Sequence, residues 1–183
     1  MHVAIGKRLA IADRSKVRHL TYAGLLDFHQ GDSWWGLSVG FRALQVAGKV
    51  LSREKLWDRE HLRITSAHPG PGVRDAIEYV TRCVSRGRFR LACSRDEIRC
   101  SRNMRFEWRV SDERETVRVR LRRGFVPDAF FDLLDRVNTP RESPEDRQRF
   151  DDFKRELSDR LWHVRLEDPF KVDSLDVDVT GHA

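Results

Sequence analysis

Alternation between apolar and charged residues over residues 88–122 constrains the fold more than any other feature of this sequence. The apolar members form three series: Phe89, Leu91 and Cys93; Met104, Phe106, Trp108 and Val110; Val117, Val119 and Leu121. Neighbouring side chains of a strand point to opposite faces of a sheet, so this period of two predicts strands with one apolar face and one arginine-rich, solvated face. The pattern is typical of an antiparallel meander.

Helical periodicity is found on the N-terminal side of these strands. Leu37, Phe41, Leu44 and Leu51 recur at the offsets of a helix with one buried face. We expect further helices over residues 16–28 and residues 73–83, with a strand over residues 61–67 before the second of them. Because an apolar sheet face must be covered, these helices are predicted to pack on one face of the meander, which gives an α+β fold.

The C-terminal part of the chain predicts a docked helix and a strand. Residues 143–146 form a capping-box pattern with proline in the first turn, after a short predicted helix over residues 127–137. Apolar residues then recur at helical spacing: Phe150, Phe153, Leu157, Leu161 and Val164. The alternation of Leu175, Val177 and Val179 predicts either an edge strand or a strand that pairs with a second protomer.

Length and composition limit the class of protein. Of the 183 residues, 39% are hydrophobic and 35% are charged, which is typical of a charge-rich globular chain rather than a disordered one. We expect a single domain over residues 1–183, with a core at 16–137 and a C-terminal helix and tail at 143–183. The sequence lacks a run of about 18 apolar residues and a signal-peptide pattern, which predicts a cytoplasmic protein without a membrane segment. Its three cysteines lack CxxC spacing, so no disulfide framework is expected.

Polar and aromatic residues crowd the entrance of the helix that contains Leu37 and Leu51. Residues 28–33 form a predicted loop in which Asp32 or Ser33 caps the helix by accepting from its free N–H groups. A second sharp break, HPGPG over residues 68–72, precedes the helix that starts near residue 73. This break is either a plain turn or a nest of N–H groups for an anion.

Both breaks resemble segments of a known family. Residues 28–42 resemble the amino-terminal core of the FmdE family of formylmethanofuran dehydrogenase components, whose signature His-Gly-His-x-Cys-Pro-Gly falls on residues 30–36. The family's Cys-x-x-Asp-Ala-Ile and Thr-Gly-Cys are similar to residues 72–77 and 81–83, and its closing Glu-Glu-Leu-Phe is similar to residues 167–171. The resemblance implies an FmdE-like fold and a homodimer.

The resemblance also implies a metal site, but this sequence departs from the signature at its ligands. Gln30 and Asp32 stand at the two histidines, Trp34 at the cysteine and Gly72 at the downstream cysteine, while Cys83 is retained. Glutamine and tryptophan are poor ligands for zinc or iron, which thiolate and imidazole bind tightly. Any inherited site must therefore have been rebuilt or lost.

We predict a rebuilt pocket between the two breaks as the leading hypothesis. Its candidate catalytic residues are His29, Asp32 and His68, because histidine exchanges protons near neutral pH and a carboxylate can orient it. The same three residues and Cys83 are candidate ligands of a divalent metal or of haem iron. The residues predicted to bind the cofactor are Gln30, Trp34, Trp35 and Cys83. The chain would then be a small-molecule or metal-cofactor binding protein, with catalysis left open.

Two other classes of function stay open. A metal-free dimeric binding or assembly module would keep the fold, with the tryptophans in its core and Asp32 serving only as a cap. The formal net charge of +6 and the outward-facing arginines instead fit binding of nucleic acid or another anion. Glu107, Glu113 and Glu115 interrupt that face and exposed aromatic residues are missing from it, which argues against nucleic acid.

Overall fold

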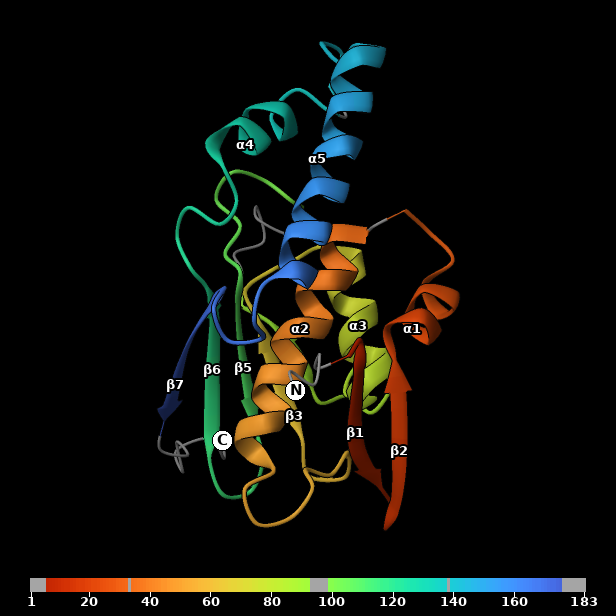
Figure 1. Cartoon of the computed structure of the whole chain (residues 1–183), viewed down its shortest axis with the longest axis vertical. Coiled ribbons are helices and arrows are strands. Elements are labelled where there is room, and N and C mark those ends of the chain that lie inside the picture. Colours follow the sequence, from red (N-terminus) through yellow and green to blue (C-terminus); the bar gives the residue numbers. More distant parts are fainter. Residues whose placement is uncertain (1–5, 33, 93–98, 138, 176–183) are drawn as a thin grey trace.

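The computed structural model describes residues 6–32, 34–92, 99–137 and 139–175 (Figure 1). Its helices are α1 (Tyr22–His29), α2 (Trp34–Leu51), α3 (Pro71–Thr81), α4 (Asp128–Leu134) and α5 (Pro144–His163). Its strands are β1 (Arg8–Asp13), β2 (Lys16–Thr21), β3 (Arg63–Ser66), β4 (Phe89–Leu91), β5 (Glu107–Ser111), β6 (Thr116–Leu121) and β7 (Phe170–Leu175). The predicted α+β class is confirmed. The positions of Ser33, Cys93, Val177 and Val179 lie outside the described residues.

The main sheet has the strand order β4-β3-β5-β6-β7. The pairs β3–β5, β5–β6 and β6–β7 are antiparallel, and β7 forms the predicted edge strand. The expectation that β4 also belongs to an antiparallel meander is wrong, because β4 pairs with β3 in parallel. The helix α3 lies between these two strands in sequence and returns the chain to the same end of the sheet, which is the connection that a parallel pair requires.

The expected helix over residues 16–28 is also wrong in its first half. Residues 16–21 form β2, which pairs with β1 in a hairpin, and only the remainder is helical as α1. Arg14 and Ser15 make the turn with φ angles of 50° and 65°. Two consecutive positive φ angles match the twist of a hairpin, although glycine or asparagine usually occupies such positions.

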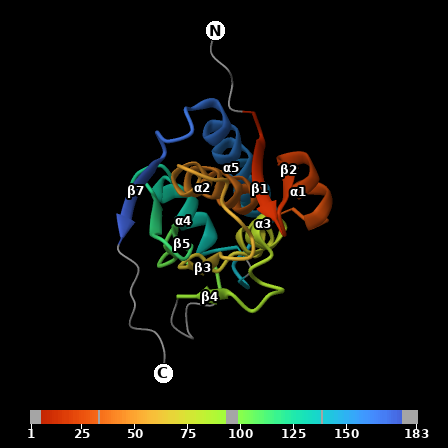
Figure 2. The same ribbon diagram turned by 90° about the horizontal axis from the view of Figure 1, so that it is seen from below.

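The helix α2 is the centre of the core. Most of its residues are buried, on all sides of the helix, because it lies between the sheet and the helices α3 and α5 (Figure 2). The inner face of the sheet meets it with Trp108, Val110, Val117 and Val119, all buried. The prediction that helices cover the apolar face is therefore confirmed, and Figure 2 shows α1, α2, α3 and α5 gathered on that side.

The C-terminal helix α5 is docked as predicted. The Ser143 hydroxyl accepts from the Asp146 N–H at 3.1 Å, which confirms the cap. Arg42 of α2 donates to the Val164 carbonyl at 2.9 Å and so ties the end of α5 to the core. Among the described residues, no helix has the length and apolar character needed to cross a bilayer.

Candidate functional site

The two sequence breaks meet in space, as the pocket hypothesis requires. They lie at the N-terminal ends of α2 and α3, where Gly36 faces the start of α3. A Cβ atom on Gly36 would lie 3.3 Å from the Val73 nitrogen and 3.4 Å from the Gly72 Cα. Such a Cβ atom would be closer to α3 than most Cβ contacts are, so the absence of a side chain at Gly36 favours this close packing of the two backbones.

Packed side chains occupy this meeting point. Trp35 is 3% exposed and its ring stacks on Phe125 with centroids 6.0 Å apart. His68 is 4% exposed, and its ring centroid lies 4.6 Å from that of Phe106. Burial lowers the pKa of His68 to about 4, so the ring is neutral at physiological pH, and its Nδ1 accepts from the Gly70 N–H at 3.0 Å. Trp35 and His68 are thus placed as core residues rather than as the walls of an open cavity.

The end of α1 and the loop before α2 have local structural roles. The predicted loop begins too early, because Phe28 and His29 are the last two residues of α1. His29 Nδ1 lies 2.6 Å from Asp75 Oδ2, which joins α1 to α3. Gln30 ends α1 in the left-handed conformation with φ 51°, and its N–H donates to the Leu26 carbonyl. Asp32 lines a small hollow of about 50 Å³ beside Trp34, which is 42% exposed. Trp34 therefore lies on the surface, whereas Trp35 is buried.

Cys83 lies at the other end of α3 from His68. The helix has 11 residues and so spans about 16 Å. Ligands of one ion lie about 2 Å from it, so His68 and Cys83 cannot bind the same ion, and the predicted four-residue metal set is wrong as a set. The Cys83 Sγ instead donates to the Leu62 carbonyl at 3.4 Å, and burial raises the pKa of the thiol. Within the described ranges, no group of three or more His, Cys, Asp or Glu residues is arranged to hold a metal ion.

The outer face of the sheet has a different character, and we call it the basic face. Cross-strand pairing aligns Arg90, Thr65, Arg109, Arg118 and Asp173 in one row. Glu107, Arg120 and Lys171 form the next row, and Arg63 shares the face with Thr65. The charged residues of the basic face are Arg63, Arg90, Glu107, Arg109, Arg118, Arg120, Lys171 and Asp173. Figure 2 shows this side of the sheet free of the helices α1, α2, α3 and α5.

The acidic residues of the basic face do not neutralise it. Asp173 accepts from Arg120 at 2.6 Å and from Arg118 at 3.2 Å, and the hydrogen bond from Arg120 is the main reason why its pKa is lowered. Glu107 lies 3.6 Å from Arg109. Two carboxylates therefore face six cationic side chains, four of which are exposed: Arg63, Arg90, Arg109 and Lys171.

A hollow continues the basic face at the end of β5 and β6 that lies nearest α4. It has a volume of about 950 Å³, and five basic side chains line it: Arg105, Arg120, Arg122, Arg123 and Lys171. Glu107 and Asp128 are its acidic residues. Phe106 and Phe131 lie half-buried in its wall, so aromatic rings are adjacent to exposed arginines.

Sequence reasoning found the arginines of this surface but not its aromatic residues. Phe106 directly precedes β5 and alternates in step with its inward-facing residues Trp108 and Val110, so the sequence assigns it to the core. Phe131 belongs to the short helix α4, which is 25 positions further along the chain. The hollow forms only because α4 folds back beside the ends of the strands. No pattern within either segment signals that contact.

Comparison with known proteins adds no family assignment: the chain matches no protein-family model, and a search of curated proteins also finds no match.

Proposed function

We propose that this protein binds an anionic polymer through the basic face and its adjoining hollow, and that single-stranded nucleic acid is the best-fitting class. The observation that carries the proposal is a set of six cationic side chains against two carboxylates, on the sheet face that the helices α1, α2, α3 and α5 leave free. Lysine and arginine that neutralise phosphates release condensed counterions, which is the main source of affinity for such polymers.

The hollow distinguishes nucleic acid from other polyanions. Arginine alone attracts any anionic chain, but bases also stack on aromatic rings, and each stacked base contributes about 1–3 kcal/mol. Phe131 supplies a half-buried ring in the same wall as Arg105 and Arg122. The Phe106 ring also lines the hollow, but it packs against Trp35 and His68 as well. A flexible single strand can turn a base into such a hollow, whereas the bases of a duplex are already stacked on one another.

The test is fluorescence anisotropy with a labelled single-stranded oligonucleotide of mixed sequence, measured over a series of salt concentrations. The variant is Arg63→Gln/Arg90→Gln/Arg109→Gln, which removes three positive charges from the basic face. The matched control is Arg141→Gln/Arg149→Gln/Arg155→Gln, which removes three exposed charges from the region of α5. Each lost phosphate contact should reduce the slope of log affinity against log salt by about 0.7, so the variant should lose about 2 units of slope and the control little.

If the two triple variants lost the same slope of log affinity against log salt, binding would depend only on the net charge of the protein. The basic face would then not be the binding site. A Phe131→Leu variant should weaken binding of the oligonucleotide but not of inorganic polyphosphate, which has no bases to stack. An equal loss of affinity for the oligonucleotide and for polyphosphate would mean that the basic face binds anions without preference for nucleic acid.

Other expectations from the sequence stay proposals. The close approach of Gly36 to α3 supports the proposed FmdE-like scaffold, since the signature glycine falls on this residue. The edge position of β7 supports a homodimer formed by strand pairing, which light scattering on the purified protein would test. A metal or haem cofactor has little support from the placement of His68 and Cys83, and elemental analysis together with an absorption spectrum would test it.

A further inference from the structure

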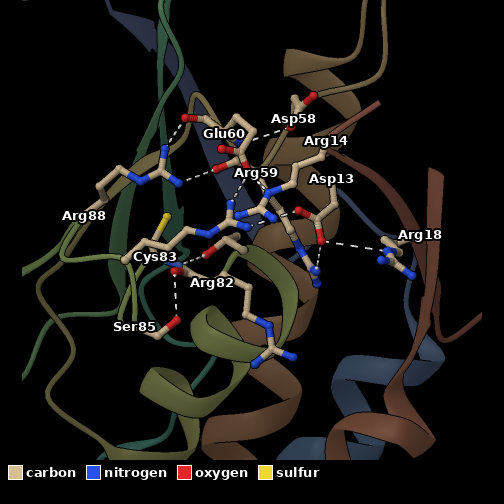
Figure 3. Close-up of polar contacts among 12 residues, drawn as sticks. Asp13, Arg14, Arg18, Asp58, Arg59, Glu60, Arg82, Cys83, Ser85 and Arg88 are labelled. Atoms are coloured by element: carbon tan, nitrogen blue, oxygen red, sulfur yellow. Dashed lines mark hydrogen bonds and ion pairs between the residues drawn. The ribbon is translucent and has the colours of Figure 1, made fainter. Parts of the chain in front are cut away.

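A second hollow lies where the hairpin of β1 and β2 meets the C-terminal end of α3. Its volume is about 600 Å³. Its main lining residues are Arg18, Leu20, Arg59, Tyr79, Arg82 and Arg86. Figure 3 shows Arg18 of the hairpin and Arg59 of the loop after α2 directed toward Asp13, whereas the guanidinium of Arg82 points away from Asp13. Arg86, which follows α3, lies 3.1 Å from the same carboxylate. None of these residues belongs to the basic face.

Arg59 is fixed in this hollow by the end of α3. It is 5% exposed, its Nε donates to the Val80 carbonyl at 2.8 Å, and its Nη2 donates to the Tyr79 carbonyl at 2.9 Å. These carbonyls belong to the last turn of the helix, where no intrahelical donor remains for them. Burial lowers the pKa of Arg59, but a guanidinium stays charged in proteins. The hollow therefore contains a rigidly held positive charge.

Asp13 is shared among three arginines. Its carboxylate lies 3.0 Å from Arg59, 3.1 Å from Arg86 and 3.8 Å from Arg18. Burial alone would raise the pKa of Asp13, but the hydrogen bonds from Arg59 and Arg86 outweigh it and the pKa is lowered. The carboxylate is thus ionised, and its single negative charge cannot neutralise three guanidinium groups.

The rim keeps an excess of positive charge. Glu60 lies 2.7 Å from Arg86, and Glu78 lies 3.4 Å from Arg82. The arginines of the hollow and its rim are Arg14, Arg18, Arg59, Arg82 and Arg86, and the carboxylates are Asp13, Glu60 and Glu78. The side chains of Arg18 and Arg82 are 53% and 42% exposed, so these two stand at the mouth where a ligand would enter.

We propose that this hollow binds a small phosphate monoester. Planar guanidinium groups match the oxygen geometry of phosphate, and Arg18 and Arg82 have donors left to contact it. Leu20 and Tyr79 form an apolar wall that accepts the organic part of the ligand. Arg59 and Arg86 are already held by their hydrogen bonds, so little conformational freedom is lost when the anion binds.

The test is isothermal titration calorimetry with phenyl phosphate and with inorganic phosphate at neutral pH and low salt. Phenyl phosphate should bind at one site and more tightly than inorganic phosphate, because its ring is buried against Leu20 and Tyr79. The variant Arg18→Gln/Arg82→Asn should weaken binding by about tenfold or more, since charge-assisted hydrogen bonds to the phosphate are lost. Asparagine is chosen because residue 82 has a φ of 60°, a conformation that asparagine tolerates.

The matched control is Arg141→Gln/Arg149→Gln, which removes the same charge from the region of α5, outside both proposed sites, and should leave the affinity for phenyl phosphate within about twofold of the parent. Circular dichroism of both double variants verifies that they fold. An equal loss of affinity in the two variants would mean that binding depends only on net charge and not on this hollow. If neither ligand showed saturable binding, the proposal of a phosphate site would be wrong. Equal affinity for the two ligands would overturn the assignment of a monoester. Binding of the oligonucleotide is scored separately, so either site can fail without the other.

Discussion

Asp13→Asn tests whether the carboxylate organises the arginine cluster. The side chain of Asp13 is 14% exposed and that of Arg59 is 6% exposed, so the substitution removes the negative charge beside a buried cation. Removing one partner of a buried ion pair costs about 3–5 kcal/mol. Asparagine keeps an oxygen that can accept from Arg59, so we expect a loss of about 2–3 kcal/mol in the free energy of unfolding. Chemical unfolding in urea at neutral pH, followed by circular dichroism, measures this loss as a lower midpoint at unchanged slope.

The control for this prediction is Asp132→Asn, since Asp132 is paired with Arg102 but has a side chain that is 61% exposed. An exposed pair contributes at most about 1 kcal/mol. The two variants should also differ in their response to pH. The pKa of Asp13 is lowered in the folded protein, so its contribution is present above the ordinary carboxyl pKa of 3.8 and is lost as the pH falls below that value. Equal losses for the two variants at neutral pH, or a difference between parent and Asp13→Asn that persists at low pH, would refute the argument.

Two further substitutions test the packing between α2, α3 and the sheet. The unfolded chain protonates His68 below pH 6.5, whereas the folded chain keeps it neutral until about pH 4, so stability should fall by as much as about 3 kcal/mol as the pH is lowered through this window. Urea unfolding of His68→Phe should show a flatter pH dependence there, and an unchanged profile would contradict the burial argument. Gly40→Ala should lower stability by about 1–3 kcal/mol, although alanine favours helices, because the new Cβ would lie 3.0 Å from Ala76 Cβ and 3.3 Å from Val73 Cα. A higher midpoint of thermal unfolding would show that α3 can move away.

The elements that sequence reasoning placed correctly are those whose burial pattern is long and regular. In α5, the apolar repeat and the Ser143 cap identify the helix independently of each other. In β5 and β6, the buried and less buried positions alternate as the residues do. The hairpin was missed because β2 has four consecutive exposed residues and so gives no alternation. Its turn residues, Arg14 and Ser15, also lack the usual glycine or asparagine signal.

The candidate site was predicted only in part, for reasons that differ between its residues. The two breaks were predicted to enclose one ligand cavity. The structure brings Gly36 of α2 close to Gly72, but the volume left there depends on how Trp35 and His68 pack, which no local sequence pattern records. His29 bonds to Asp75, which is 46 positions away in the chain, and that partner was not anticipated. The separation of Cys83 from His68 could have been predicted from the sequence, because the helix predicted between them is too long for both residues to contact one ion.

A ligand cavity and a binding surface make opposite demands on a sequence. A cavity needs unfilled volume beside polar groups. Here α2 packs so closely on the start of α3 that a Cβ atom on Gly36 would lie 3.3 Å from the Val73 nitrogen, and the neighbouring Trp35 is buried. A surface for anions needs cations beyond those that nearby carboxylates neutralise, and both the basic face and the hollow around Asp13 meet that requirement. Salt screens the electrostatic attraction of exposed charges of this kind, but it does not screen the apolar packing of an aromatic cluster. Ligand binding by this protein should therefore weaken steeply with ionic strength under conditions that leave its fold intact.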